Sequence, residues 1–487
     1  MIFNSVSFIL FLAAFTSLWW MLPERPRHWL IFLGSLLFYG FWRVEFVAVL
    51  LLSMSTDYAA ALALDRTTTR WKRRALLSLS VLVNLGLLTY FKYADFLLSN
   101  FAKLSLLTGF DLSVTPLNIV LPLGISFYTF QSISYTVDVY RRQVRAERDY
   151  LCFANFVLFF PQLVAGPILR AAEVIEQLKS RQPFRLFDLS FGIKTILSGM
   201  FLKVVLADNL APLVDDAFSM PSGSFGAKES WALASLFGYQ IYFDFAGYSL
   251  IAIGSARLMG VHFPANFDWP YISRSPREFW RRWHISLSSW IRDYLYLPLC
   301  GMRTRDDSLG GLAEVAQQDV KTREGKRIWA LLVTWAIMGL WHGANWTFVL
   351  WGLWHAVLIL GYRLLTPRLV LPRPLAAIGG WLVTYPLILL GWIPFRAQSV
   401  SEAVSLMINA FTPSSYLLPF ALPRHYYTLS LLLPLAMVTA YILHVSWPRL
   451  RRLPVVGDVM HIGGLAFAFG LVFVFFRPIR QFIYFQF

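Results

Sequence analysis

Long apolar stretches follow one another along the chain, separated by short polar or basic breaks. A helix that crosses a bilayer needs roughly 20 apolar residues, and about a dozen stretches approach that length. No large water-soluble domain fits between them. The pattern therefore predicts an all-α polytopic integral membrane protein with about 11–12 transmembrane helices. The predicted spans are residues 3–21, 29–41, 46–63, 75–97, 117–140, 188–212, 231–257, 328–341, 346–363, 377–395, 428–446 and 461–477.

Two stretches depart from this pattern. Residues 153–168 are apolar but contain Pro161, Gly166 and Pro167 and have basic flanks, which is typical of a re-entrant hairpin that does not cross the bilayer. Residues 261–327 form the longest polar-rich stretch, where we expect cytoplasmic interfacial helices and a loop. Taken together, residues 1–487 are predicted to form a single membrane domain.

Composition agrees with a membrane protein, because 57% of the residues are hydrophobic and only 14% are charged. The net charge of +16 resides in short loops, which predicts a membrane orientation rather than a nucleic-acid surface.

Residues 2–21 lack a positive segment before them and a small-residue cleavage site after them, so they are interpreted as a retained first span. By the positive-inside rule, the loops with Arg25 and Arg27, with residues 66–74, with residues 141–148 and with Arg449, Arg451 and Arg452 are cytoplasmic. The N-terminus and the loops at 100–115, 214–230 and 396–427 are then expected outside.

Several kinds of chemistry have no matching motif in the sequence. Cys152 and Cys300 show no CxxC spacing, which argues against a disulfide framework or a zinc site. No histidine pair has metal-ligand spacing on a helix, and no HExxH motif occurs, so we expect no metal. The absence of a GxSxG elbow and a Walker A loop argues against a serine hydrolase and a nucleotide-driven pump.

Residues 266–292 carry the first candidate chemistry. Ser275 and Pro276 mark a helix start, with Glu278 in the first turn. His284 is the residue that a plain membrane-surface helix does not explain. Apolar residues at three- and four-residue spacing predict an amphipathic helix with a face suited to the headgroup boundary, namely Trp280, Trp283, Leu287 and Trp290. Cations along this stretch are suited to binding phosphate groups, namely Arg277, Arg281, Arg282 and Arg292.

The second candidate is His342, in the motif MGLWHGANW at the junction of two apolar spans. Gly339 and Gly343 flank it without bulk, so that backbone or substrate can approach closely. An ionisable residue near bilayer depth costs free energy unless it has a partner or a water-filled cavity, which makes His342 a functional candidate. The alternative is a hydrogen-bonded packing histidine in an aromatic belt. His355, on the next span, either orients His342 or packs.

Three charged residues fall within predicted spans, namely Asp138, Lys203 and Asp244. Each is expected to face the interior of the helix bundle, because exposure to lipid is costly. Asp244, with the nearby Tyr248, either lines a path for an acceptor substrate or stabilises helix packing. The sequence leaves both alternatives open.

Motifs spread over nearly the whole chain resemble the membrane-bound O-acyltransferase superfamily, and within it the bacterial alginate O-acetylase branch. They are MIFNSVSFILFL, LLTYFKYADF, LPLGISFYTFQSISYTVDVYR, FFPQLVAGPILR, QIYFDFAGYS, EFWRRWHISLSSWIRDYLY, GLWHGANWTFVLWGLWH and FIYFQF. The resemblance implies a ring of tilted helices around a thinned centre in the bacterial inner membrane. It also implies a tunnel from a cytoplasmic donor pocket to the outer face.

The resemblance implies an activity as well. An acetyl group would pass from a cytoplasmic thioester, acetyl-CoA, toward hydroxyls of an exported polysaccharide such as alginate, with periplasmic acetyltransferase partner proteins. His342 would be the catalytic residue and general base, and His284 the second functional histidine. The donor phosphates would lie near Arg277, Arg281, Arg282 and Arg292, and the substrate path would include Asp244, Tyr248 and Asn345. No bound cofactor or metal is expected.

The chain departs from the family pattern at two places. The first is the link at 302–327, which is longer than expected, with Cys300 and Met302 where a Gly and an Asn are expected. The second is Asp268, which replaces an expected Asn.

Two other functions compete with acetyl transfer from acetyl-CoA. One competing function is acyl or D-alanyl transfer from a carrier protein. The other is a non-enzymatic transporter of a lipid-linked glycan that uses the three intramembrane charged residues.

Overall fold

The computed structural model describes residues 1–110, 114–164, 166–180, 183–302, 324–365, 372–450 and 456–476, and every regular element in these ranges is a helix. Arg451, Arg452 and the terminal FIYFQF motif lie outside the described residues. The chain forms two compact units, the first made of residues 1–196 and 251–264 and the second of residues 197–250 and 265–487. The single domain over 1–487 stays a prediction.

In the part of residues 1–196 that the structure describes, the first unit contains ten complete helices and most of an eleventh. They are α1 (Val6–Met21), α2 (Glu24–Gly40), α3 (Glu45–Arg66), α4 (Arg70–Leu88), η1 (Thr89–Tyr93), α5 (Ala94–Leu107), α6 (Ile125–Arg141), α7 (Tyr150–Leu158), α8 (Phe160–Leu163), α9 (Ala171–Lys179) and α10 (Leu186–Met200). The second unit contains most of the long helix α12 (Ala227–Leu258), whose last turns belong to the first unit. Its other helices are η2 (Phe201–Ala207), α11 (Asp208–Ser219), η3 (Ser222–Ser224), η4 (Pro270–Ile272), α13 (Pro276–Arg282), α14 (Ile285–Ile291), η5 (Arg292–Tyr296), α15 (Leu297–Leu299), α17 (Glu324–His342), α18 (Trp346–Leu365), α19 (Arg373–Leu390), α20 (Trp392–Arg396), α21 (Val400–Asn409), η7 (Pro413–Tyr416), α22 (Arg424–Leu450) and α23 (Val456–Phe475).

Among the described residues, six helices are long and apolar enough to cross a membrane. They are Glu45–Arg66, Arg70–Leu107, Leu186–Ser219, Trp346–Leu365, Pro374–Arg396 and Arg424–Leu450, with shorter apolar helices at Val6–Met21 and Ile462–Phe475. The remaining predicted spans, at 29–41, 117–140, 231–257 and 328–341, overlap α2, α6, α12 and α17. Each predicted stretch therefore overlaps a helix, and the protein is an all-α, multi-pass membrane protein.

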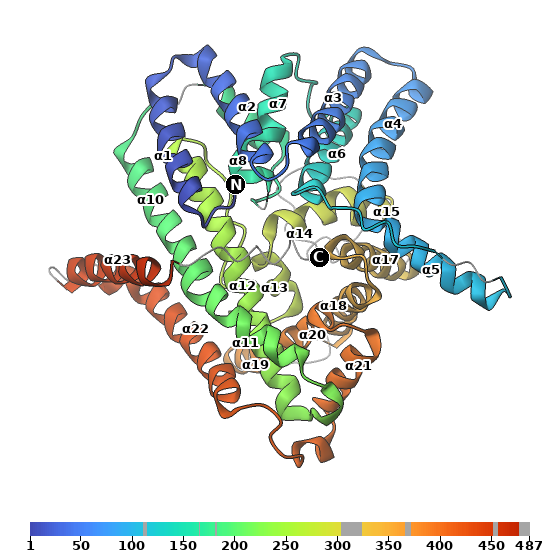
Figure 1. The fold of residues 1–487 in the computed structure, drawn as a ribbon, viewed down its shortest axis with the longest axis vertical. Coiled ribbons are helices and arrows are strands. Elements are labelled where there is room, and N and C mark those ends of the chain that lie inside the picture. Colours follow the sequence, from blue (N-terminus) through green and yellow to red (C-terminus); the bar gives the residue numbers. More distant parts are fainter. Residues whose placement is uncertain are drawn as a thin grey trace. The chain divides into compact units, whose positions relative to one another are not determined.

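Polar side chains hold the first unit together inside its three-helix core. Helices α3, α4 and α6 pack against one another (Figure 1). The fully buried Asp57 carboxylate on α3 accepts hydrogen bonds from Ser80 Oγ at 2.5 Å and from Asn84 Nδ2 at 2.9 Å, both on α4. The hydroxyl oxygens of Ser80 and of Thr136 on α6 lie 3.1 Å apart, within hydrogen-bonding distance. Because buried polar groups must be paired, these bonds fix how the three helices face each other.

The predicted re-entrant stretch at 153–168 is a broken helix. Helix α7 ends at Leu158, and the short α8 follows after Phe159, with Pro161 in its first turn, where proline is tolerated. Gln131 Nε2 on α6 donates to the Phe156 carbonyl at 2.8 Å, so that a freed carbonyl near the break is satisfied. The break agrees with the sequence, while insertion of this stretch into the bilayer stays a prediction.

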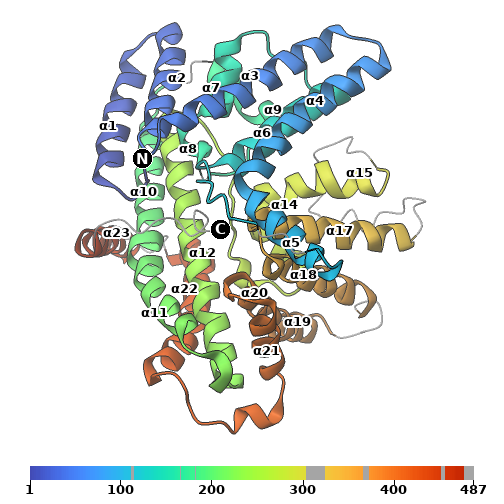
Figure 2. The same ribbon diagram turned by 45° about the vertical axis from the view of Figure 1, so that its right-hand side comes forward.

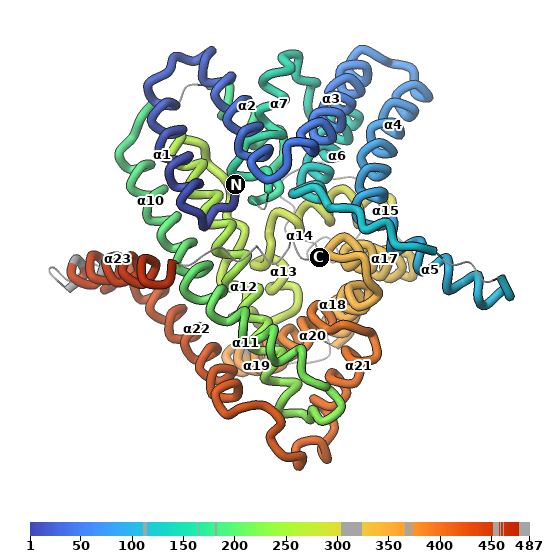
Figure 3. Tube along the Cα trace, in the orientation of Figure 1, coloured from blue at the N-terminus to red at the C-terminus, as the bar shows by residue number. Residues whose placement is uncertain are grey.

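In the second unit, α17 and α18 form its closest helix pair and carry the WHG motif between them (Figure 2). A side chain at Gly352 would place its Cβ 2.0 Å from the Trp335 carbonyl oxygen, and one at Gly339 would lie 2.1 Å from the Phe348 oxygen. The two backbones approach so closely because both helices carry glycine at the crossing. Figure 3 follows the chain from this pair onward through α20 and α21, which both pack against α18.

We expect Gly352→Ala to destabilise the protein by at least about 1–3 kcal/mol, because the added methyl group forces α17 and α18 apart. The matched control is Gly361→Ala, since Gly361 lies on the same helix and its Cβ position meets nothing within 4 Å. Thermal unfolding in detergent measures both. Equal melting temperatures for the two variants would contradict this account of the helix pair.

Candidate active site

The chain around His284 forms two short helices instead of the single amphipathic helix predicted from the sequence. The predicted start is correct, because Ser275 Oγ accepts the Glu278 backbone N–H at 3.1 Å. Helix α13 then ends at Arg282, and α14 starts at Ile285, with His284 between them at a backbone φ of +41°. This left-handed conformation is uncommon for a residue other than glycine, and it breaks the helix at the functional candidate.

The predicted tryptophan face toward the headgroup boundary is also wrong. Trp280 and Trp283 are only 2% and 1% exposed, and Trp290 is buried as well. The Trp280 ring lies 4.6 Å from that of Trp335, and the Trp283 ring lies 4.7 Å from that of Trp392. These indoles pack into protein because the break at His284 turns both short helices into the core of the second unit.

The hydrogen bonds of His284 define which ring nitrogen carries the proton. Its Nδ1 lies 3.2 Å from Asn266 Oδ1, and the Ser286 backbone N–H, which can only donate, points at the same oxygen from 3.3 Å. The amide of Asn266 is held in this orientation by its Nδ2, which donates to Ser249 Oγ at 3.0 Å. Because Oδ1 is an acceptor, Nδ1 is the protonated nitrogen, and Nε2 is left as the proton-accepting nitrogen of His284.

Burial lowers the pKa of His284 to about 3 from its ordinary 6.5, since the enclosed site disfavours the charged imidazolium. The unfolded chain takes up a proton below pH 6.5 and the folded chain does not, so the imidazole weakens stability as the pH falls from about 6.5 toward 3. At pH 5 we expect the loss to be about 2 kcal/mol relative to pH 7.5.

Unfolding of wild type and His284→Gln in detergent at pH 7.5 and pH 5 measures this contribution. The wild type is expected to lose about 2 kcal/mol more than the variant, because glutamine does not titrate. The comparison of pH differences removes any stability that the substitution itself changes at pH 7.5. An equal loss in both proteins would mean that His284 is not held neutral.

His342 is the last residue of α17, and its imidazole lies inside an aromatic enclosure. The ring centres of Trp341, Trp351 and Phe395 lie 4.9, 4.8 and 5.2 Å from that of His342. The side chain is 3% exposed. Gly343 is required directly after it, because a Cβ there would lie 2.1 Å from the Phe348 ring. The surrounding aromatic rings therefore leave His342 almost completely buried.

Trp341 and Trp351, which contact His342, also lie close to two other buried histidines, His284 and His355. The Trp341 ring centre lies 6.4 Å from that of His284, and the Trp351 ring centre lies 4.9 Å from that of His355. His355 Nδ1 accepts a hydrogen bond from Trp280 Nε1 at 3.3 Å, so His355 is bonded to the indole network. The folded chain thus gathers residues 280–284, 341–342 and 351–355 around one aromatic cluster.

Two of the four predicted donor-binding arginines make ion pairs within the protein. Arg282 pairs with Glu278 at 3.0 Å and with Asp268 at 3.2 Å, which ties the end of α13 to the turn that precedes the helix. Arg292 is buried and pairs with its neighbour Asp293 at 2.5 Å, inside the π-helical η5. Asp268, one of the departures from the family pattern, therefore has a structural partner.

The other two arginines differ in exposure. Arg281 is exposed, whereas Arg277 is buried with its guanidinium 5.7 Å from the Tyr362 ring centre. Burial lowers the pKa of Arg277 below its ordinary value, and the positive charges of Arg281 and Arg363 add to the effect. An anion beside Arg277 would favour its charged form, and binding of the donor phosphates at Arg277 and Arg281 stays a prediction.

The predicted substrate-path residues Asp244 and Tyr248 lie together beside Lys203. The Lys203 ammonium lies 2.5 Å from Asp244 and 2.8 Å from Asp208, and 5.8 Å from the Tyr248 ring centre. Lys203 and Asp244 are both buried, and Lys203 sits in the π-helical segment η2. The packing alternative accounts for this ion pair, while a path along these residues stays a prediction.

Asn345, the third predicted path residue, is an exposed residue at the turn between the two helices of the WHG motif. Its side-chain oxygen accepts the Thr347 backbone N–H at 3.2 Å, at the start of α18. This is the role of a helix-capping residue. Asn345 therefore helps to orient α18, and its contact with a substrate stays a prediction.

Similarity to known proteins decides the family. The chain is 38% identical over 423 residues to the probable alginate O-acetylase AlgI of Azotobacter vinelandii, covering 85% of this chain and 78% of that protein. It is 39% identical over 415 residues to the protein of the same name from Pseudomonas aeruginosa, covering 83% and 73%. The chain belongs to the membrane-bound O-acyltransferase family. The family's sequence model, described as the membrane-bound O-acyltransferase family, matches residues 141–309.

A peptidoglycan O-acetyltransferase from Helicobacter pylori extends the range of similar proteins, with 33% identity over 416 residues, 79% of this chain and 73% of that protein. The chain described in this structure is therefore an enzyme, and the transporter alternative is set aside. Lys203 and Asp244, which that alternative assigned to a transport pathway, form an ion pair with each other.

One residue of the site, Asn266, escaped the sequence analysis. Nothing in its local pattern distinguishes it, since NFDWPY reads as a proline-marked turn. Its importance arises from a contact with His284 that lies 18 positions further along the chain. The sequence alone does not predict that the asparagine in this turn contacts the histidine at the helix break.

Proposed function

We propose that this enzyme transfers acetyl groups from acetyl-CoA on the cytoplasmic side toward hydroxyls of an exported polysaccharide. The protein would lie in a bacterial inner membrane with its N-terminus outside, as the positions of the basic loops favour. The similarity to proteins named for O-acetylation of alginate and of peptidoglycan, over more than three quarters of the chain, supports acetyl as the group. Alginate is one candidate polymer, and periplasmic acetyltransferases are the expected partners.

His342 would act as the general base. It would take the proton from the acceptor hydroxyl while the hydroxyl oxygen attacks the thioester carbonyl carbon. The C–S bond then breaks, and the proton passes from the imidazole to the leaving thiolate, so that an ester and a free thiol result. The observation that carries this proposal is the dehydrated enclosure of His342 by Trp341, Trp351 and Phe395, because exclusion of water limits hydrolysis of the thioester.

His284 would position a substrate through Nε2. Its neutral tautomer, with Nδ1 bonded to Asn266, presents an acceptor suited to a hydroxyl or to the amide N–H of a pantetheine arm. Arg277 and Arg281 would contribute the positive charge for the donor phosphates, and Arg282 and Arg292 would shape the same region through their ion pairs. No bound cofactor or metal enters this scheme.

The donor is the most direct test of this proposal. Membranes from a strain deleted for the protein, with and without a complementing copy, are supplied with acetyl-CoA labelled in the acetyl group, and label in the polymer fraction is counted. We expect label only with the complementing copy. A parallel assay supplies labelled D-alanyl carrier protein. Label transferred from that donor but not from acetyl-CoA would contradict the acetyl-CoA proposal and support the alternative of transfer from a carrier protein.

A further inference from the structure

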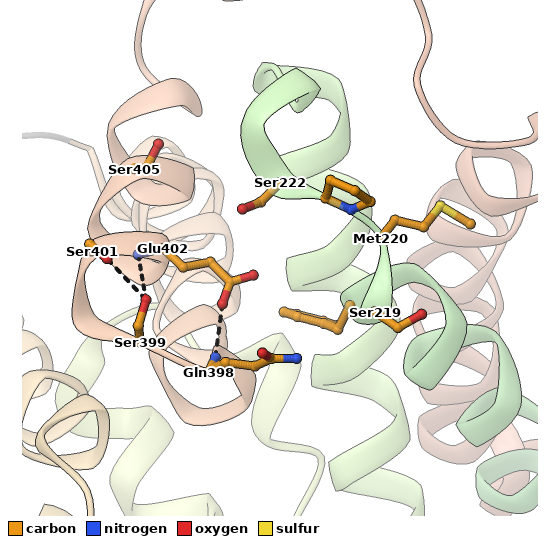
Figure 4. A pocket seen from close by; sticks show the side chains of 10 residues that line it. Ser219, Met220, Ser222, Gln398, Ser399, Ser401, Glu402 and Ser405 are labelled. Carbon is orange, nitrogen blue, oxygen red and sulfur yellow. Dashed lines mark hydrogen bonds between the residues drawn. The ribbon is translucent and has the colours of Figure 1, made fainter.

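A surface pocket in the second unit lies apart in sequence from the histidine-bearing segments. It has a volume of about 670 Å³ and is formed by the end of α11 with the following turn and by the start of α21. This volume falls within the range of about 300–1,000 Å³ that is usual for small-molecule sites. Figure 4 shows the side chains of Gln398 and Glu402 extending from the α21 side toward the turn that carries Ser219 and Ser222.

The lining is rich in neutral hydrogen-bonding groups. Its ten residues include five serines, one glutamine amide and one carboxylate, together with three residues that offer apolar surface. None of these ten lining residues is a lysine, arginine or histidine. The lining residues are Phe218, Ser219, Met220, Pro221, Ser222, Gln398, Ser399, Ser401, Glu402 and Ser405.

Internal hydrogen bonds hold one wall of the pocket in place. Ser399 Oγ accepts the Glu402 backbone N–H at 3.1 Å, and Glu402 Oε2 accepts the Gln398 backbone N–H at 2.9 Å. The Ser399 and Ser401 hydroxyls lie 3.0 Å apart (Figure 4). The second carboxylate oxygen of Glu402 extends beyond this capping arrangement, so the pocket contains a fixed negative charge with remaining acceptor capacity.

Arg396, close to the pocket wall in sequence, forms an ion pair with a residue outside the lining. Arg396, two residues before Gln398, pairs with Asp215 at 2.9 Å, and its guanidinium lies 5.5 Å from the Phe218 ring centre. Arg396 is not among the residues that line the pocket. A ligand in the pocket therefore meets the Glu402 charge without a compensating lysine or arginine in the lining.

The pocket lies where two candidate membrane spans end. The span Leu186–Ser219 and the span Pro374–Arg396 both finish at it, while Arg185 and Arg373 stand at their other ends. Arg396 also stands at the pocket end of the second span, but the loops that follow the two spans, 214–230 and 396–427, carry few and balanced charges. Because an excess of basic residues marks cytoplasmic loops, the pocket is assigned to the outer face of the membrane. That is the side on which an exported polymer is present.

We propose that this pocket binds a short, uncharged saccharide segment on the outer face of the membrane. This inference rests on the proposed function and names the substrate class as a neutral glycan. Serine hydroxyls, the glutamine amide and the carboxylate match the dense donors and acceptors of sugar hydroxyls, and the apolar faces of Phe218, Met220 and Pro221 match the C–H faces of the rings. A uronate would place its carboxylate near Glu402 with no lysine, arginine or histidine in the lining, and like charges repel.

The test measures binding of two tetrasaccharides to the full-length protein in lipid nanodiscs. Cellotetraose serves as the neutral probe and a mannuronate tetramer as the charged probe. We expect cellotetraose to bind more tightly than the uronate, and Glu402→Gln to weaken cellotetraose binding by about 10-fold, as expected for a lost hydrogen bond to a charged group. Ser405→Trp, which fills the pocket from an exposed position, is expected to abolish binding.

Two controls lie next to these positions but outside the lining. Val404→Trp adds the same bulk to α21, and Ser224→Ala removes a hydroxyl from the turn beyond Ser222. Both are expected to bind cellotetraose as the wild type does. Equal loss in Val404→Trp and Ser405→Trp would overturn the proposal, because the effect would then come from disturbance of α21.

Tighter binding of the mannuronate tetramer, or binding of neither probe, would also overturn the assignment to a neutral glycan. Binding of neither probe would leave a segment of a partner protein as the ligand to consider. The donor assay separates these outcomes from the proposed function. Cellotetraose binding without acetyl transfer would contradict the proposed function alone, whereas acetyl transfer without saccharide binding would contradict the pocket assignment alone.

Discussion

A His342→Ala variant is expected to lose about 10²–10⁴-fold in the rate of acyl transfer, the usual contribution of a general base. The reason is that the His342 imidazole, enclosed by Trp341, Trp351 and Phe395, is the group proposed to accept the proton of the hydroxyl, and alanine cannot accept it. The loss should appear mainly in kcat, because a base acts in the transition state rather than in ground-state binding. Initial rates with labelled acetyl donor at several concentrations measure it.

His425→Ala is the matched control, since His425 is an exposed histidine on α22. It should retain wild-type activity at equal abundance in the membrane. His342→Gln tests whether shape suffices, because glutamine fills much of the same space without titrating. Full activity in His342→Ala or His342→Gln would remove His342 from the catalytic role.

Lys203→Met is expected to destabilise the protein by about 3–5 kcal/mol, because it leaves the Asp208 and Asp244 carboxylates without their cation. Asp244 and Lys203 are almost completely buried, so water cannot replace the lost charge. Unfolding in detergent measures the loss. Adding Asp244→Asn to Lys203→Met should recover part of it, because one of the two carboxylates that lost the lysine charge is then removed.

Lys194→Met provides the comparison, since Lys194 is exposed on the helix that runs into η2. Its effect should be well below that of Lys203→Met. If both substitutions cost the same stability, or if Asp244→Asn worsens the Lys203 variant, the ion pairs do not hold η2 to α12.

The sequence by itself determined the class of the protein and the approximate position of its long apolar helices. Spans of apolar residues are dictated by bilayer thickness, a local requirement that does not depend on what a helix later contacts. The capped start of α13 was predicted for the same reason, since Ser275 and Glu278 act within a single helical turn. His284 and His342 stood out because ionisable residues among apolar ones are rare.

Only the tertiary structure decided what surrounds those histidines. The spacing of Trp280 and Trp283 indicated a face suited to the headgroup boundary, but the left-handed backbone at His284 directs both rings into protein. Periodicity describes one regular helix and cannot locate a break that is stabilised by distant partners. Asn266 likewise became part of the site only when folding brought it to His284.

The ion pairs and the outer pocket also depend on contacts between distant segments, which the sequence did not predict. Lys203 and Asp244 were recognised as costly charges, but their pairing depends on the packing of η2 against α12. The pocket joins the turn after α11 to the start of α21, two segments about 180 positions apart in the sequence, which no local pattern relates. Requirements that act within one helix or turn can therefore be predicted from the order of residues. Contacts between distant segments depend on how the whole chain packs, so they are seen only in the folded structure.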